Sequence, residues 1–179
     1  MKTFIFLLTL IGATLTGSVA MSREWLVDRI SGTAYAISQS KERFEIKREM
    51  KIAEGLTIAT GPNGRVRLVS ENNVMTLMPN SVAAVVPKSL FSAKTEVRQK
   101  AGSIEFDIEK RKQPHFTVQT PYMAAVVKGT KFTVSVAKAK TNIGVTRGLV
   151  QVSDLRTGQT AAVGAGRNAS VATAKGGLS

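Results

Sequence analysis

The sequence lacks most of the residues that enzymes use for chemistry. It has no cysteine and a single histidine among 179 residues, which excludes disulfides and thiolate metal sites. A Ser-His-Asp triad would need His115 as its base, and no Gly-x-Ser-x-Gly segment accompanies it. We interpret His115, which precedes Phe116 at a strand start, as a surface or turn residue. The sequence therefore predicts a non-enzymatic protein without a metal or cofactor.

Carboxylates are spaced for an outer sheet face and not for acid–base catalysis. Glu105, Asp107 and Glu109 alternate with apolar residues, so all three point to the same side of one strand. Their oxygens could bind a cation weakly. We expect instead a solvated face that is screened by the basic residues 110–112.

Long apolar runs are absent after the first twenty residues. Those residues combine Lys2, an apolar run over about residues 4–16 and small residues up to Ala20, which is typical of a secretory signal peptide. The run is short for a membrane span, which needs roughly 20 residues. We expect cleavage near Ala20 and a periplasmic or secreted bacterial protein. An uncleaved anchor and a cytosolic start at Met21 are the alternatives.

Acidic residues are scarce in the C-terminal half. Residues 110–179 contain 11 basic residues and one acid, Asp154, whereas residues 21–109 contain 13 basic and 11 acidic residues. Such asymmetry suggests either an anionic partner or a loose attraction to an anionic envelope. Aromatic residues that could stack bases are few here, which argues against nucleic acid as a partner. The candidate partner-binding residues are Lys110, Arg111, Lys112, Lys128, Lys131, Lys138, Lys140 and Arg147.

Alternation with period two predicts short β-strands along the chain. The clearest case is residues 104–108, where Ile, Phe and Ile alternate with Glu and Asp. Residues 40–51 are charged, and either an exposed strand pair or a short helix fits them. We expect the small, polar residues 172–179 to fray. The other predicted strands lie around residues 25–37, 56–59, 65–68, 74–78, 81–86, 150–152, 161–163 and 169–171, and three short strands lie within residues 116–136.

A loose glycine repeat indicates how these strands stack. Gly102, Gly129, Gly148 and Gly166 each precede a short strand, at spacings of 27, 19 and 18 residues. Repeats near 20 residues favour an all-β, solenoid-like stack in which each coil buries its apolar face against the next. A β-sandwich or a barrel would give a similar number of strands.

One passage combines strand, Thr-Pro turn, strand, Gly-Thr turn and strand: FTVQTPYMAAVVKGTKFTVSV, residues 116–136. We expect Thr120, Pro121, Gly129, Thr130 and Phe132 to be structural, because glycine permits a tight bend and a threonine hydroxyl can bond to a nearby backbone group. Accordingly, Gly129→Val should impair folding and not a specific activity.

Six ordered segments together resemble the FecR domain, the periplasmic part of iron-siderophore signal transducers. Besides the passage above they are EGLTIATGPNGRVRLVS, NNVMTLMPNSVAAVV, RQKAGSIEFDI, RGLVQVSD and AVGAGRNASV. The resemblance covers about residues 53–171. It divides the chain into a signal peptide (1–20), an N-terminal strand with a charged segment (21–52), the FecR-like domain (53–171) and a flexible tail (172–179).

The resemblance implies a solenoid-like fold and protein–protein contact in the cell envelope. Well-known family members bind the signalling domain of an outer-membrane receptor and control a sigma factor, through a cytoplasmic region and a membrane helix. Here a signal peptide directly precedes the domain, so we expect a stand-alone exported member with an undefined envelope partner. The alternative is a binder of anionic envelope ligands, such as peptidoglycan, polysaccharide or lipid headgroups, through the basic C-terminal half.

Overall fold

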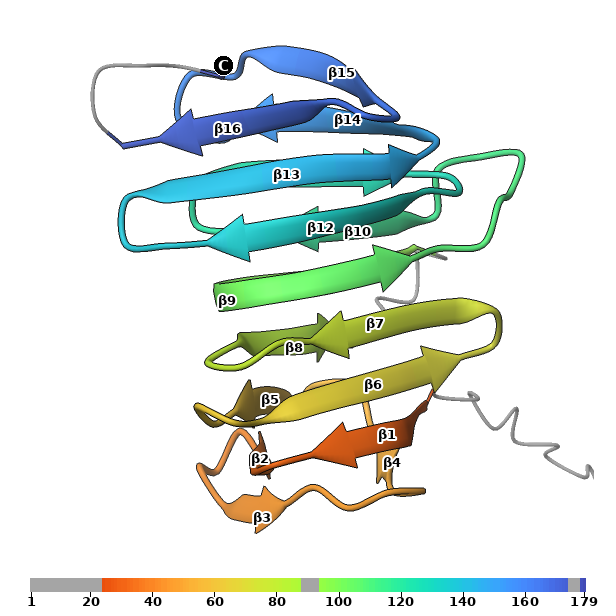
Figure 1. The fold of residues 1–179 in the computed structure, drawn as a ribbon, viewed down its shortest axis with the longest axis vertical. Coiled ribbons are helices and arrows are strands. Elements are labelled where there is room, and N and C mark those ends of the chain that lie inside the picture. The colour runs from red at the N-terminus through yellow and green to blue at the C-terminus, as the bar shows by residue number, and fades with distance from the viewer. Residues whose placement is uncertain (1–23, 88–93, 174–177) are drawn as a thin grey trace, which may run out of the picture.

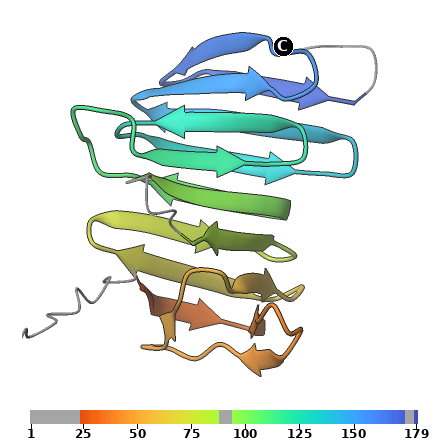
Figure 2. The ribbon, with the colours of Figure 1, turned by 180° about the vertical axis from the view of Figure 1, so that it is seen from behind.

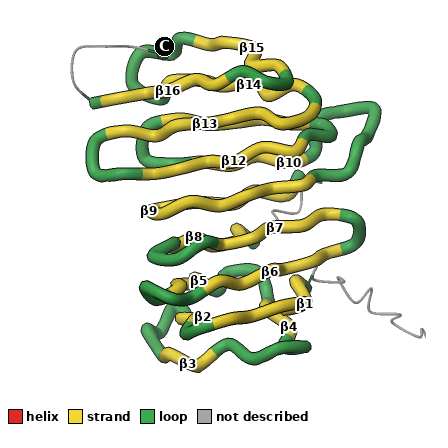
Figure 3. The backbone as a smooth tube through the Cα atoms, in the orientation of Figure 1, coloured by secondary structure: helices red, strands yellow, loops and turns green. Residues whose placement is uncertain are grey.

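The computed structural model describes residues 24–87, 94–173 and 178–179, and every regular element in them is a β-strand. The tube in Figure 3 shows strands and loops without a helix, so the all-β prediction is confirmed. No helix in this described part could span a membrane. The predicted signal peptide lies outside the described residues.

Sixteen strands form two sheets that face each other (Figures 1 and 2). In the front sheet of Figure 1 the order is β4 (Lys51–Ile52), β1 (Trp25–Ser31), β6 (Arg65–Ser70), β7 (Asn73–Leu77), the second half of β9 (Thr95–Asp107), β12 (Lys131–Val136), β13 (Lys140–Arg147) and β16 (Asn168–Ala172). In the back sheet it is β3 (Arg43–Glu45), β2 (Ala34–Ile37), β5 (Thr57–Thr60), β8 (Val82–Val86), the first half of β9, β10 (Phe116–Gln119), β11 (Met123–Val127), β14 (Leu149–Asp154) and β15 (Thr160–Gly164).

Strand β9 belongs to both sheets and joins them. Its first half pairs with β8 and β10, and its second half pairs with β7 and β12. The strand bends at Gly102, where φ is +80°. A Cβ there would overlap Ser81 and lie 2.6 Å from the Asn80 carbonyl oxygen, so only glycine fits. The buried Gln99 amide donates to the Gly102 and Val134 carbonyls at 2.9 and 3.0 Å, which fixes the bend.

The repeated glycines mark the places where the chain changes sheets. After the bend in β9, Gly129 leads from β11 to β12, Gly148 from β13 to β14, and Gly166 from β15 to β16. Between crossings the chain forms hairpins within one sheet, such as β10–β11 and β12–β13. The structure is therefore a stack, as the repeat predicts, but its unit is a hairpin in a two-layered sandwich that is not closed into a barrel.

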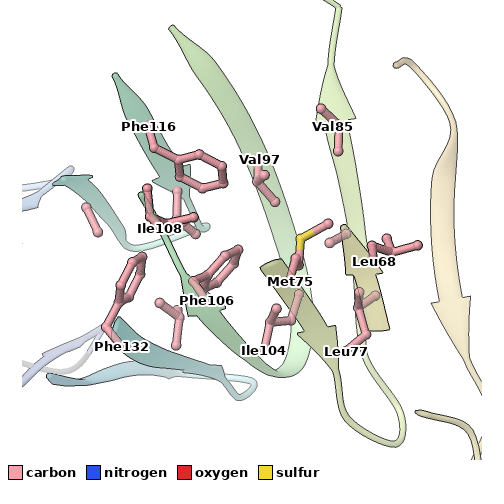
Figure 4. Close-up of a cluster of buried hydrophobic side chains, with 14 of the residues drawn as sticks. Leu68, Met75, Leu77, Val85, Val97, Ile104, Phe106, Ile108, Phe116 and Phe132 are labelled. Atoms are coloured by element: carbon pink, nitrogen blue, oxygen red, sulfur yellow. The ribbon is translucent and has the colours of Figure 1, made fainter. Parts of the chain in front are cut away.

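The core lies between the two sheets and follows the alternation of the sequence. Phe106 stacks on Phe132 with ring centroids 5.0 Å apart and meets the edge of Phe116 at 5.9 Å. Figure 4 shows these rings with Met75 and Ile104 of the front sheet between the layers. Each fully buried side chain of this size contributes about 1.5–3 kcal/mol through removal from water, so the continuous core stabilises the whole stack.

The charged segment at residues 40–51 closes the N-terminal end of the sandwich. It forms two short strands, β3 and β4, which pair with β2 and β1 in different sheets and not with each other, so neither the strand pair nor the helix of the sequence prediction is correct. Ile46 between them is 2% exposed and belongs to the core, and its N–H donates to the Ala34 carbonyl. The end of the core is thereby covered, as the end of a stacked fold requires.

The C-terminal end is covered much less. Among the described residues, strand β15 pairs only with β14, and β16 pairs only with β13 and with the last residue of the chain. Ser179 exchanges two main-chain hydrogen bonds with Ser170, and Leu178 packs against the core. These described residues of the predicted fraying tail are thus attached to the sheet.

Asp154 fixes the turn between β14 and β15. Its Oδ1 accepts N–H groups of Arg156 at 2.8 Å and Thr157 at 3.1 Å, and the residue is 1% exposed. Burial raises the pKa of Asp154. The opposing effect is larger: the pKa is lowered by backbone hydrogen bonds from Arg156 and Thr157, by the Thr157 hydroxyl and by the charge of Arg156, so the net shift is downward. The only acid of the C-terminal half thus holds a turn and does not face a partner.

We expect Gly102→Ala to be far more destabilising than Gly158→Ala. Both glycines have positive φ, +80° and +73°, but nothing lies within 4 Å of a Cβ at Gly158. The left-handed conformation alone costs about 1–2 kcal/mol, and overlap at Gly102 should add about 2 kcal/mol or prevent folding. Urea unfolding of both variants measures the difference, and equal losses would show that the bend does not depend on glycine.

Replacement of Asp154 should weaken the fold in a pH-dependent way. Asp154→Ala leaves two turn N–H groups without their acceptor, so its urea midpoint at pH 7 should fall. The folded-state pKa lies below the unfolded value of about 3.9, so the carboxylate stabilises the fold above that pH and ceases to do so as the pH falls through the folded pKa. The difference between wild type and Asp154→Asn should therefore shrink from pH 5 to pH 2. A difference that stays constant would contradict this role.

Candidate functional site

The eight basic residues predicted to bind a partner do not form one site. Three of them are engaged with acids on the outer face of the front sheet: Lys131 with Glu105 at 3.0 Å, Arg147 with Asp107 at 2.7 Å, and Arg111 with Glu109 and Glu71 at 3.1 and 2.8 Å. These pairs neutralise the carboxylate face that the alternation places outward. Of residues 110–112, only Arg111 forms such a pair, so the expected screening comes mostly from neighbouring strands.

Hydrogen bonds on the ion-paired face shift the pKa values of Glu109 and Arg111. Hydrogen bonds from Asn72 and Arg111 lower the pKa of Glu109, and hydrogen bonds to Glu109 and Glu71 raise the pKa of Arg111. These groups therefore stay charged around neutral pH and bind one another. Exposed pairs of this kind contribute little to stability, and the face offers few uncompensated charges to a ligand.

The remaining basic residues lie at opposite sides of the sandwich. Lys110, Lys112 and Lys128 are exposed where β9 and β11 end, and the Arg111 N–H donates to the Lys128 carbonyl. Lys138 and Lys140 are exposed at the other end of β12, which is about 20 Å away for a six-residue strand. We call Lys110, Lys112 and Lys128 the basic patch.

The motif residues lie at turns and in the core. The Thr120 hydroxyl donates to the Met123 carbonyl at 3.1 Å and lies 3.2 Å from the Thr141 hydroxyl of the front sheet. Buried Thr130 donates to the Leu149 carbonyl at 3.1 Å, which ties two sheet crossings together. Gly129 lies against the Lys110 backbone, Pro121 is exposed in its turn, and Phe132 is in the core.

His115 is buried in the loop between β9 and β10, so the surface alternative of that interpretation was wrong. It is 8% exposed, its N–H donates to the Val127 carbonyl, and its own carbonyl accepts from Thr95. The loop from β9 brings His115 between Thr95 and the end of β11, which the position before Phe116 did not reveal. In the described ranges, no three His, Asp or Glu residues gather as metal ligands would.

The outer edge of β15 carries main-chain groups that can accept a further strand. The Asp154 N–H donates to the Gln159 carbonyl. Hydrogen-bonded pairs alternate in an antiparallel ladder, so Ala161 and Val163 bond to β14 in the observed register. The N–H groups of Thr160, Ala162 and Gly164 therefore point away from β14.

A hollow of roughly 810 Å³ lies at the same end, between β15 and β16. Small residues of β15 line it together with the polar side chains of Gln159, Arg167 and Asn168, so its lining is about equally polar and apolar. Leu178 and Ser179 occupy one side. We define the open end by β15, β16 and this hollow.

Two exposed arginines flank the open end. Arg156 lies in the turn before β15 and Arg167 in the turn after it. The described residues of this end carry no exposed acid, since Asp154 is buried. The predicted set of partner-binding residues ends at Arg147 and includes neither arginine; the scarcity of acids after residue 110 was the signal in the sequence that covers this end.

Solved structures share this architecture. Two crystal structures of a candidate anti-sigma factor from Parabacteroides distasonis ATCC 8503, at 2.50 and 1.65 Å resolution, superpose with a TM-score of 0.60 at 18% sequence identity. The alignment covers 69% of this chain and 57% of theirs, so the chain spans little more than half the length of these relatives. At this identity the likeness concerns the fold. No curated protein sequence matches the chain.

The family model described as FecR protein matches residues 56–151. The matched range begins just before β5 and ends within β14, and it includes the bend of β9 and the Thr-Pro and Gly-Thr turns. Five of the six segments on which the resemblance in the sequence rested lie wholly or partly in this range, and the sixth, residues 162–171, lies beyond it. The chain therefore belongs to the FecR protein family.

Proposed function

We infer that this chain is an exported, non-enzymatic FecR-type module that contacts another protein of the cell envelope in a signalling role. Membership of the FecR family supports a regulatory part, and the N-terminal twenty residues support export. The observation that carries the contact role is the inequality of the two ends. In the described residues both ends have edge strands, but β3, Ile46 and β4 cover the N-terminal end of the core, whereas a hollow adjoins the edge of β15 at the C-terminal end.

The open end suits a protein partner better than a small molecule. The hollow is open and not enclosed, and the described residues contain no group of three His, Asp or Glu that could hold a metal ion. Unpaired strand edges are templates for pairing with another chain. A rigid sandwich with one such edge can bind without reorganisation, which lowers the entropic cost of association.

A second candidate function rests on the basic patch. Lys110, Lys112 and Lys128 are exposed, and none forms a salt bridge in the described structure. Such a patch could bind an anionic envelope polymer such as peptidoglycan, polysaccharide or lipid headgroups. Its binding would weaken steeply as salt rises.

Site-specific crosslinking in cells tests the first function. A photo-crosslinking residue at Ala162, on the open end, should give one discrete adduct with an envelope protein. The same residue at Glu45, exposed on β3 at the covered end, should give none. Equal adduct patterns from the two positions would contradict a partner site at the open end.

Charge reversal separates the second function from the first. The double variant Lys112→Glu/Lys128→Glu should lose retention on an anionic polysaccharide resin at least tenfold relative to wild type at 150 mM salt, if the basic patch binds polyanions. The matched control, Lys47→Glu/Arg48→Glu, changes exposed residues near the covered end by the same net charge. Similar losses for both variants would indicate only a loose attraction from the overall charge, and the Ala162 crosslink should persist in both.

A further inference from the structure

We propose that the open end binds an extended, acidic segment of the partner, which adds as a new strand to β15 and reaches Arg156 and Arg167 with carboxylates at its two ends. The proposal rests on the function inferred above, since it specifies the chemistry of the partner at that same end. Three observations carry it: the direction of the free main-chain groups, the shape of the hollow, and the sign of the surrounding charge.

Main-chain groups on β15 are arranged for a strand and not for an isolated ligand. Thr160 and Ala162 direct both N–H and C=O away from β14, and Gly164 adds one further N–H. Within the described ranges, the main-chain groups of Thr160 and Ala162 on this side form no other backbone hydrogen bond. Added strands obtain their affinity from such a row of groups.

The opposite sheet already shows this mode of binding. Ser170 of β16 turns its N–H and C=O outward, and Ser179 bonds to both at 2.6 and 3.0 Å. One edge of the open end is thus partly occupied by the last residue of the chain itself. The equivalent edge on β15 has no described strand beside it.

The side chains of β15 define what the added strand should carry. Val163 and Ala161 face inward, whereas Thr160 and Ala162 are exposed on the outer face. A strand beside β15 would place alternate side chains over the hollow, whose small residues leave room for β-branched apolar groups. The partner segment should therefore alternate apolar and polar residues.

Charge decides between an acidic partner and a second copy of this chain. Arg156 and Arg167 are exposed at opposite ends of β15, and the end has no exposed acid among its described residues. Two copies joined edge to edge would bring four arginines together, and like charges in register are destabilising. Carboxylates at both ends of a seven-residue strand, about 23 Å long, would instead pair with the arginine in each flanking turn.

The edge is also held in place before binding. Asp154 fixes the turn before β15, the Leu178 N–H donates to the Gln159 side-chain oxygen, and β15 pairs with β14 along its length. A preformed edge loses little conformational entropy when a strand is added. Most of the conformational entropy lost on binding therefore comes from the partner segment.

Peptide titration of the full chain tests the proposal. The probe is the blocked heptapeptide Glu-Thr-Val-Thr-Val-Thr-Glu, followed by the amide NMR signals of Thr160, Ala162 and Gly164 at 150 mM salt. The expected result is saturable shifts of these three signals. A peptide with Lys in place of both Glu residues should bind at least tenfold more weakly, and so should the protein variant Arg156→Glu/Arg167→Glu towards the original peptide.

Proline variants distinguish strand addition from other contacts. Ala162→Pro removes an outward N–H without removing a bond to β14, and proline is tolerated on edge strands, so it should fold normally and lose peptide binding about tenfold. Ala161→Pro removes a bond to Val152 and should destabilise the fold. Full binding by folded Ala162→Pro, or no shift of the three amides at millimolar peptide, would overturn the proposal.

Two further outcomes separate this proposal from the function on which it rests. If the Ala162 crosslink to an envelope protein persists while the peptide fails, protein binding stands and acidic strand addition is wrong. If sedimentation shows a dimer that Ala162→Pro abolishes, the edge binds a second copy, and the acidic segment is likewise excluded.

Discussion

The fold depends on one strand that belongs to two sheets. Strand β9 leaves the back sheet at Gly102 and continues in the front sheet, so both layers share one covalent element at the middle of the stack. The bend needs a residue without a Cβ, because Ser81 and the Asn80 carbonyl fill the space beside it. Gln99 holds the bend from inside through two carbonyls. With the layers fixed in this way, Phe106, Phe116 and Phe132 meet in one core.

A sandwich built from stacked hairpins has two ends, and in this chain the core is covered differently at each. At the N-terminal end a charged segment crosses the core and inserts Ile46. At the C-terminal end only Leu178 and Ser179, among the described residues, lie across the opening. An unpaired edge next to a hollow is costly to leave exposed to other chains. Edge strands lie at both ends of the described structure, since β3 and β4 each have one strand neighbour, but the hollow adjoins the edge of β15 at the C-terminal end.

The same architecture decides which basic residues form ion pairs and which are exposed. Basic residues that face the carboxylates of β9 are neutralised within the front sheet. Those in loops and at the open end, such as Lys128 and Arg167, are exposed. The net charge of +13 is therefore not spread evenly over the surface. The ion-paired face has little net charge, whereas the open end is basic, because its one acid, Asp154, is buried in a turn.

The sequence by itself determined the strand class, the positions of most strands, the inward residues and the family. Alternation of apolar residues with period two specifies the buried face of a strand whatever its neighbours, and glycines with positive φ mark sharp changes of direction. Which strands become neighbours is a long-range property, and only the tertiary structure decided it. The pairing of Lys131 with Glu105, the burial of His115, the capping role of residues 40–51 and the free edge of β15 all depend on segments distant in the chain, whose contacts no local pattern records.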